Sequence, residues 1–264
     1  MFENKKEFKL ITKKNPKSLL PNALTIFGVC LGLSSIKFAL DANYGMAIIA
    51  IGFAAILDTL DGRVARLIKG TSKIGKELDS LTDVISFGVA PGFIIYFWAL
   101  NEIGKFGWMF VLIYTVCCAL RLARFNLMII EENETWKINF FEGVPSPAAA
   151  GLVLLPLILS LSGIVQFENY TVLSSIAILT TSILMVSKIP TYSLKRILIP
   201  RHLAIFLLLG IGIYVSLLIF YTFETLFFSG LIYIFLIPIS YFHYRNKNKT
   251  SLIDNSEEET EDVL

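Results

Sequence analysis

Long apolar runs constrain the fold of this chain more than any other feature. About eight of them, each roughly 18 to 22 residues long and able to cross a bilayer as a helix, follow one another with short polar connections. Hydrophobic residues make up 55% of the 264 residues, too many for an ordinary soluble domain. The sequence predicts an all-α integral membrane protein, with transmembrane helices near residues 20–40, 45–66, 75–100, 106–127, 144–165, 169–187, 203–222 and 225–242.

Polar segments flank the predicted transmembrane catalytic domain, residues 20–243. Residues 1–19 mix lysines with apolar residues, which predicts either a helix on an anionic membrane surface or a frayed basic tail. Residues 244–264 change from basic to acidic without apolar periodicity, so we expect a disordered tail. The N-terminus has no short apolar run ending at a cleavage site, so we expect the first span to target the chain.

Lysine and arginine are distributed unevenly between the two predicted membrane sides. One side collects the N-terminal lysines, the connection 63–76 and most later basic residues, whereas the other holds Lys105, with Lys37 nearby. Because basic loops stay in the cytosol, we expect both termini and the connection 63–76 to face it. The net charge of +2 gives no reason to expect a nucleic-acid partner.

Four aspartates lie where the second and third predicted spans meet this cytosolic connection. Asp58 and Asp61 are three residues apart, and Asp79 and Asp83 are four apart, so each helix presents two carboxylates on one face. A carboxylate in a spanning helix costs about 2.5–3.5 kcal/mol even on lenient insertion scales. A divalent cation would offset that cost, and oxygen ligands without nearby His or Cys favour magnesium, manganese or calcium over zinc.

Four carboxylates are more than one magnesium ion usually takes from a protein, so two ions with bridging carboxylates fit better. Two metals about 4 Å apart are a known arrangement for phosphoryl chemistry. Gly62 and Ala65 leave room beside the acids, and Arg66 could bind a phosphate. The alternative is a salt-bridged helix pair that uses Arg63, Arg66 and Lys69.

The pattern Asp-x2-Asp-Gly-x2-Ala-Arg-x8-Gly-x3-Asp-x3-Asp, which begins at Asp58, resembles the signature of the CDP-alcohol phosphotransferase family at all eight fixed positions. The resemblance implies a membrane enzyme that transfers a phosphatidyl or related group from a CDP-linked lipid to an alcohol and releases CMP. Asp58, Asp61, Asp79 and Asp83 would then hold one or two Mg²⁺ or Mn²⁺ ions, with Asp83 also the catalytic base. Candidate donor-binding residues are Asn22, Thr25, Asp61, Gly62, Ala65, Arg66, Thr71, Ser72 and Gly75.

A second constellation lies at the cytosolic end of the fourth and fifth predicted spans. The segments RLARFN (121–126) and FEGVPSPAAA (141–150), with SKIP (187–190), resemble the phosphatidylserine synthase branch of that family. The resemblance implies L-serine as acceptor and a homodimer. Candidate serine-binding residues are Arg121, Arg124, Asn126, Ser146 and Lys188, and the alternative for each is a snorkelling or helix-capping role.

Two rival functions stay open at this stage. Within the family, the acceptor could be glycerol 3-phosphate or an inositol phosphate, whose dianion would want a denser basic pocket. From another class, acids in spanning helices also mark cation transporters. The run 45–57 offers no polar path past the acids, which counts against transport. The sequence does not distinguish ester-linked from ether-linked lipid donors.

Overall fold

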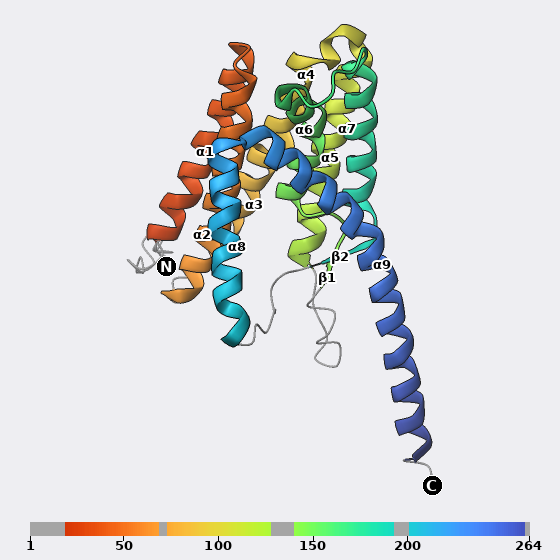
Figure 1. Cartoon of the computed structure of the whole chain (residues 1–264). Coiled ribbons are helices and arrows are strands. Elements are labelled where there is room, and N and C mark those ends of the chain that lie inside the picture. Colours follow the sequence, from red (N-terminus) through yellow and green to blue (C-terminus); the bar gives the residue numbers. More distant parts are fainter. Residues whose placement is uncertain (1–18, 69–72, 128–139, 193–200, 262–264) are drawn as a thin grey trace, which may run out of the picture.

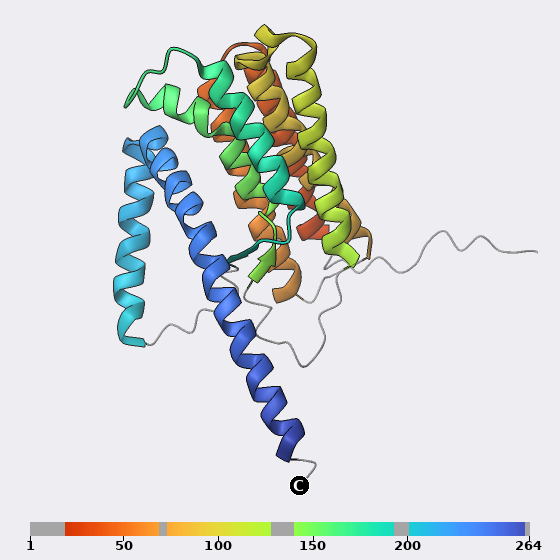
Figure 2. The same cartoon turned by 90° about the vertical axis from the view of Figure 1, so that its right-hand side faces the viewer.

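The computed structural model describes residues 19–68, 73–127, 140–192 and 201–261 (Figure 1). Most of them are helical, and most of the helices run up or down a common axis, with α9 tilted across the others (Figures 1 and 2). The elements are α1 (Leu19–Leu40), α2 (Tyr44–Leu67), α3 (Lys73–Asp83), the π-helix η2 (Val84–Val89), α4 (Ala90–Trp98), the 3-10 helix η3 (Leu100–Ile103), α5 (Lys105–Leu127), β1 (Phe140–Glu142), α6 (Ser146–Ser162), α7 (Tyr170–Val186), β2 (Pro190–Tyr192), α8 (Arg201–Phe220) and α9 (Thr222–Glu261).

Six segments are long and apolar enough to cross a membrane: residues 19–40, 44–67, 74–98, 105–127, 203–220 and 222–245. This confirms the predicted all-α membrane fold. The apolar helices α6 and α7 have 17 residues each, or about 25 Å of helix, near the lower limit for a span. A total of eight transmembrane helices therefore stays a prediction.

The buried core is centred on α6, which packs against α4, α7 and α9. Ten of its 17 residues are buried, including Ala149, Val153 and Leu157. By contrast, none of the described side chains of α8 is buried, and the main neighbour of α8 is α9. Because α8 is almost entirely apolar, its exposed surface suits contact with lipid.

The third predicted span is not one regular helix, because α3 widens into the π-helix η2 directly after Asp83. The wider turns free backbone carbonyls, and α5 supplies hydroxyls to them. Tyr114 donates to the Phe87 carbonyl at 2.7 Å. On the opposite side α1 packs so closely that a Cβ on Gly32 would lie 2.5 Å from the Ser86 hydroxyl oxygen. The segment that follows Asp83 is therefore held from both sides.

A short antiparallel ladder joins the start of α6 to the end of α7, with Phe141 opposite Thr191. Gly143 follows β1 with φ +72°, and a Cβ there would lie 2.6 Å from the Met185 carbonyl oxygen. The Gly143 amide donates to the Ile189 carbonyl, and Thr191 donates to the Gly143 carbonyl. The sequence did not predict this ladder, since strands of three residues have no readable period.

The disordered tail expected at residues 244–264 stays a prediction. Helix α9 continues to Glu261, through the segment expected to be disordered. No glycine or proline occurs after Pro238, so nothing in the backbone chemistry ends the helix. The surface helix expected in residues 1–19 lies outside the described residues, apart from Leu19.

Candidate active site

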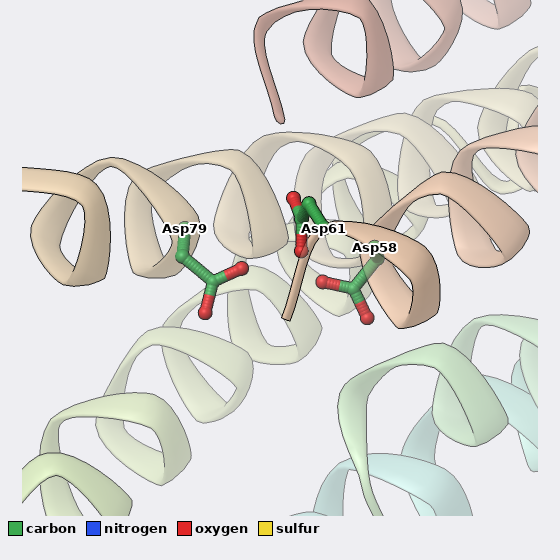
Figure 3. A group of neighbouring side chains, drawn as sticks. All are labelled: Asp58, Asp61 and Asp79. Atoms are coloured by element: carbon green, nitrogen blue, oxygen red, sulfur yellow. The ribbon is translucent and has the colours of Figure 1, made fainter. Parts of the chain in front are cut away.

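Three of the four predicted carboxylates converge at one end of the bundle. Asp58 and Asp61 lie in the last three turns of α2, and Asp79 lies on α3. One oxygen from each lies within 4.8 Å of the other two. Figure 3 shows Asp58 and Asp79 pointing toward each other from separate helices, with Asp61 between them. The geometry thus joins residues 18 positions apart in the sequence, Asp61 and Asp79, in one small volume.

Asp61 is held in place from α1. The side chain of Asp61 is 4% exposed, and its Oδ2 lies 2.6 Å from the Thr25 hydroxyl oxygen. That hydroxyl also lies 3.0 Å from the Pro21 carbonyl oxygen, and because it has a single proton we assign the hydrogen bond to the nearer carboxylate. Thr25, predicted as a donor-binding residue, therefore fixes the orientation of a carboxylate.

No described cation neutralises the three acids. Among the residues whose side chains the structure describes, the single ion pair joins Lys37 and Asp41, outside the site. Arg66 does not pair with an acid there; its Nε donates to the Gly62 carbonyl oxygen at 3.1 Å. The salt-bridged alternative is thus not seen for Arg66, and Lys69 lies outside the described residues. Three convergent carboxylates without a counter-charge fit a hard divalent cation.

Asp83 lies beside this group without belonging to it. Its carboxylate is in hydrogen-bonding range of Asp58 and near Asp79 and Arg121, yet Asp83 is not part of the trio. Its Oδ1 is buried with no hydrogen-bond partner among the described atoms. The described neighbours therefore leave one oxygen of Asp83 unpaired, and the role of Asp83 as a metal ligand stays a prediction.

Arg121 forms the second part of the site. It is 6% exposed, and its Nη1 donates to the Ser146 hydroxyl oxygen at 2.7 Å. Ser146 is fully buried at the first turn of α6, where the Cys118 thiol also approaches its oxygen at 3.8 Å. These contacts orient the guanidinium, while its Nε is left buried without a hydrogen-bond partner among the described atoms. The structure thus brings Arg121 and Ser146 together, next to Asp83.

The other predicted acceptor residues lie at the same end but are engaged differently. Arg124 donates to the carbonyl oxygens of Val186 and Ser187, at the end of α7. Asn126 donates to the Ser80 hydroxyl on α3 at 2.8 Å. Lys188 is exposed. These contacts tie neighbouring ends of α3, α5 and α7 together, and direct binding of an acceptor by these three residues stays a prediction.

The other described candidate donor-binding residues lie on α1, α2 and α3, the helices that carry Thr25 and the carboxylates. Gly62 is exposed, with nothing within 4 Å of where a Cβ would be, so open space adjoins Asp61. Asn22, Ala65 and Gly75 are half-buried, and Arg66 is exposed. Thr71 and Ser72 lie outside the described residues.

The sequence did not predict that α9 contributes a residue, Tyr233, to the surroundings of Arg121. Tyr233 lies on this helix with its hydroxyl buried, next to Thr191 and within electrostatic range of Arg121. A weak signal was present, because Gly230, Tyr233, Ile237 and Ser240 share one helical face. Nothing in that spacing indicates that the face would meet a residue more than a hundred positions earlier.

Fold and site together define a class: an all-α membrane protein that holds uncompensated carboxylates at one end of its bundle. Comparison with known families makes this specific. Residues 18–191 match the model of the CDP-alcohol phosphatidyltransferase family, and the chain belongs to that family.

Several relatives are named CDP-diacylglycerol–serine O-phosphatidyltransferase. The one from Mycobacterium leprae is 41% identical over 187 residues, which cover 70% of this chain and 62% of that protein. The one from Helicobacter pylori strain 26695 is 40% identical over 183 residues, 69% of this chain and 76% of the relative. The one from Bacillus subtilis is 35% identical over 177 residues, which cover 67% of this chain and 92% of that protein. The chain thus spans a little under two thirds of the M. leprae relative and most of the B. subtilis one.

Proposed function

We propose that this protein transfers a phosphatidyl group from a CDP-linked diacyl or related lipid to the hydroxyl of L-serine, with release of CMP. One observation carries the proposal: the carboxylates of Asp58, Asp61 and Asp79 converge without a protein counter-charge. A metal-assisted diphosphate reaction uses such a group. The names of the relatives supply the acceptor.

The donor binds with its lipid chains beside the apolar helices and its CDP group at the carboxylates. Asp58, Asp61 and Asp79, with Asp83 as a further ligand, would hold Mg²⁺ or Mn²⁺, which would neutralise charge on the diphosphate. Gly62 and Ala65 leave space for the nucleotide, and Arg66 can turn from the Gly62 carbonyl to a phosphate. The positive-inside bias places this end in the cytosol.

Serine binds on the Arg121 side of the site. Its carboxylate needs cationic or hydrogen-bonding partners, and Arg121 is a buried guanidinium with an unpaired Nε–H. Ser146 holds that guanidinium through Nη1. Lys188, Arg124 and Asn126 are at the same end and remain candidates for guiding serine inward.

The reaction is a direct displacement at the lipid-bearing phosphorus. The serine hydroxyl oxygen forms the new P–O bond, the P–O bond to CMP breaks, and the hydroxyl proton passes to Asp83. The unpartnered Oδ1 of Asp83 supports this role, because a base must have a free oxygen in reach of the proton. The nearest cysteine, Cys118, bonds Ser146, so no activated nucleophile favours a covalent intermediate.

We expect Asp83→Asn to lower kcat at least about 100-fold, since general bases contribute about that much or more. Donor and Mn²⁺ should still bind through the unchanged trio, with lower Mn²⁺ affinity because one further ligand loses its charge. Single-turnover CMP release with serine, beside equilibrium binding of donor, measures the two separately. Wild-type turnover by the variant would remove Asp83 from the role of base.

The deciding experiment offers the detergent-solubilised protein CDP-diacylglycerol, Mg²⁺ or Mn²⁺, and a panel of alcohols. Release of CMP with serine, and with no other alcohol of the panel, supports the proposal. Release with glycerol 3-phosphate or an inositol phosphate would keep the family and replace the acceptor. Metal flux into liposomes without any CMP release would favour transport. A cross-linking experiment on the same sample tests the homodimer that we propose by resemblance.

A further inference from the structure

One face of α9 is buried against α6 and β2. Phe223, Leu226, Tyr233 and Ile237 pack on the apolar core from this face. At Gly230 the two helices approach so closely that a Cβ would lie 2.4 Å from Leu155 Cδ1. In lipid, a polar group on such a face needs a partner, because no water is there to replace one.

Tyr233 breaks the apolar character of this face. Its ring packs with the core, but its hydroxyl is buried and forms no hydrogen bond of normal geometry with the described atoms. Thr191 is beside it and already donates to the Gly143 carbonyl oxygen at 2.8 Å. The Thr191 hydroxyl oxygen keeps acceptor capacity toward Tyr233, although no bond of normal geometry is formed. A second polar neighbour is Arg121 on α5, within electrostatic range of Tyr233.

Three unpaired polar atoms therefore gather from three elements. They are the Tyr233 hydroxyl, the Arg121 Nε–H and the Asp83 Oδ1. Arg121 interacts electrostatically with both other residues. An unpaired buried polar group destabilises the fold, so such a set fits a site that a ligand completes.

We propose that Tyr233 is an acceptor-binding residue: its O–H and the Arg121 Nε–H donate to the carboxylate of the acceptor, whose hydroxyl lies toward Asp83. This deepens the proposed function and rests on it. The set selects an alcohol that carries a carboxylate, because a neutral alcohol would leave both donors unpaired. Tyr233 lies beyond residues 18–191, so acceptor choice depends partly on a helix outside the segment that the family model matches.

The test is Tyr233→Phe, which removes one oxygen and keeps the ring. We expect KM for serine to rise about tenfold, while kcat and KM for CDP-diacylglycerol change less than about twofold, because a hydrogen bond to a charged group is lost from one substrate alone. The thermal midpoint without serine should stay equal or rise, because the removed hydroxyl has no protein partner. Tyr241→Phe, an exposed tyrosine of the same helix, is the matched control.

Each outcome is informative. A lower thermal midpoint with an unchanged KM for serine would make Tyr233 structural and overturn the inference. Equal increases in KM for both substrates would overturn it too. L-serinamide, which lacks the carboxylate, adds a second readout: its competition with serine should be weakened little by Tyr233→Phe, and a tenfold weakening would contradict a carboxylate contact. If the wild type releases no CMP with serine, the proposed function itself has failed, which is a separate result.

Discussion

At the scale of single residues, the energetics are dominated by Asp58, Asp61 and Asp79. Their ionised forms lose hydration in the bundle, and the side-chain donor to Asp61 is the neutral hydroxyl of Thr25. Binding of a cation then carries folding free energy, since the folded chain binds it and the unfolded chain does not. At a free cation concentration of 100 times Kd, the folded state gains about 2.7 kcal/mol of stability.

We expect Asp79→Asn to abolish the stabilisation that Mn²⁺ gives the folded protein. One of three converging carboxylates loses its charge, and activity should fall at least about 100-fold because the charge on the diphosphate is no longer balanced. Thermal unfolding with Mn²⁺ and with EDTA measures the effect. Asp41→Asn, whose carboxylate pairs with Lys37 on the surface, should keep the wild-type difference. An Asp79 variant that still responds to Mn²⁺ would contradict a metal centre built on the trio.

Thr25→Val should weaken metal binding without disturbing the fold. Valine has the same shape, but it cannot donate to Asp61 Oδ2, so the carboxylate loses its fixed orientation. Loss of such a supporting contact costs roughly 10- to 100-fold in metal affinity. The Mn²⁺ dependence of CMP release gives the value, with Thr180→Val on an exposed face of α7 as control. An unchanged Mn²⁺ dependence would show that the hydrogen bond does not organise the site.

At the scale of elements, the ends of the helices position the site. The π-helix η2 holds the chain after Asp83, and the β1–β2 ladder joins α6 to α7 beside Arg121. Arg124 adds to the ladder by binding the last carbonyls of α7, where a cation also meets the negative end of the helix dipole. These contacts fix α6, and with it Ser146 and the Arg121 guanidinium.

Arg124→Ala separates two roles for this arginine. Its carbonyl contacts predict a lower thermal midpoint and a lower kcat, with KM for serine changed less than about twofold. Direct acceptor binding, the role predicted from sequence, would instead raise KM for serine at an unchanged midpoint. Thermal unfolding and serine titration on one preparation distinguish the two roles. The control is Lys105→Ala, because Lys105 is exposed in another part of the bundle.

At the scale of the whole molecule, much of the architecture was predictable. The expected spans 45–66 and 106–127 fall within one residue of the bounds of α2 and α5, because a bilayer demands long apolar helices and the sequence must show them. The convergence of Asp58, Asp61 and Asp79 was also predictable from helical spacing. The π-helix, the ladder and the place of Tyr233 were not, because each depends on contacts between distant segments that no local period encodes.

Membrane orientation gives the last prediction. Lys76, near the carboxylates on α3, and Lys105, at the start of α5, are both exposed and lie near opposite ends of the bundle. In a chain whose three cysteines are replaced by serine or alanine, we introduce Lys76→Cys or Lys105→Cys and treat intact cells with a membrane-impermeant maleimide. Because basic connections stay inside, Lys105→Cys should react in intact cells and Lys76→Cys after permeabilisation. The reverse pattern would put the carboxylates outside, away from any cytosolic CDP-linked donor, and would contradict the proposed reaction in the cell.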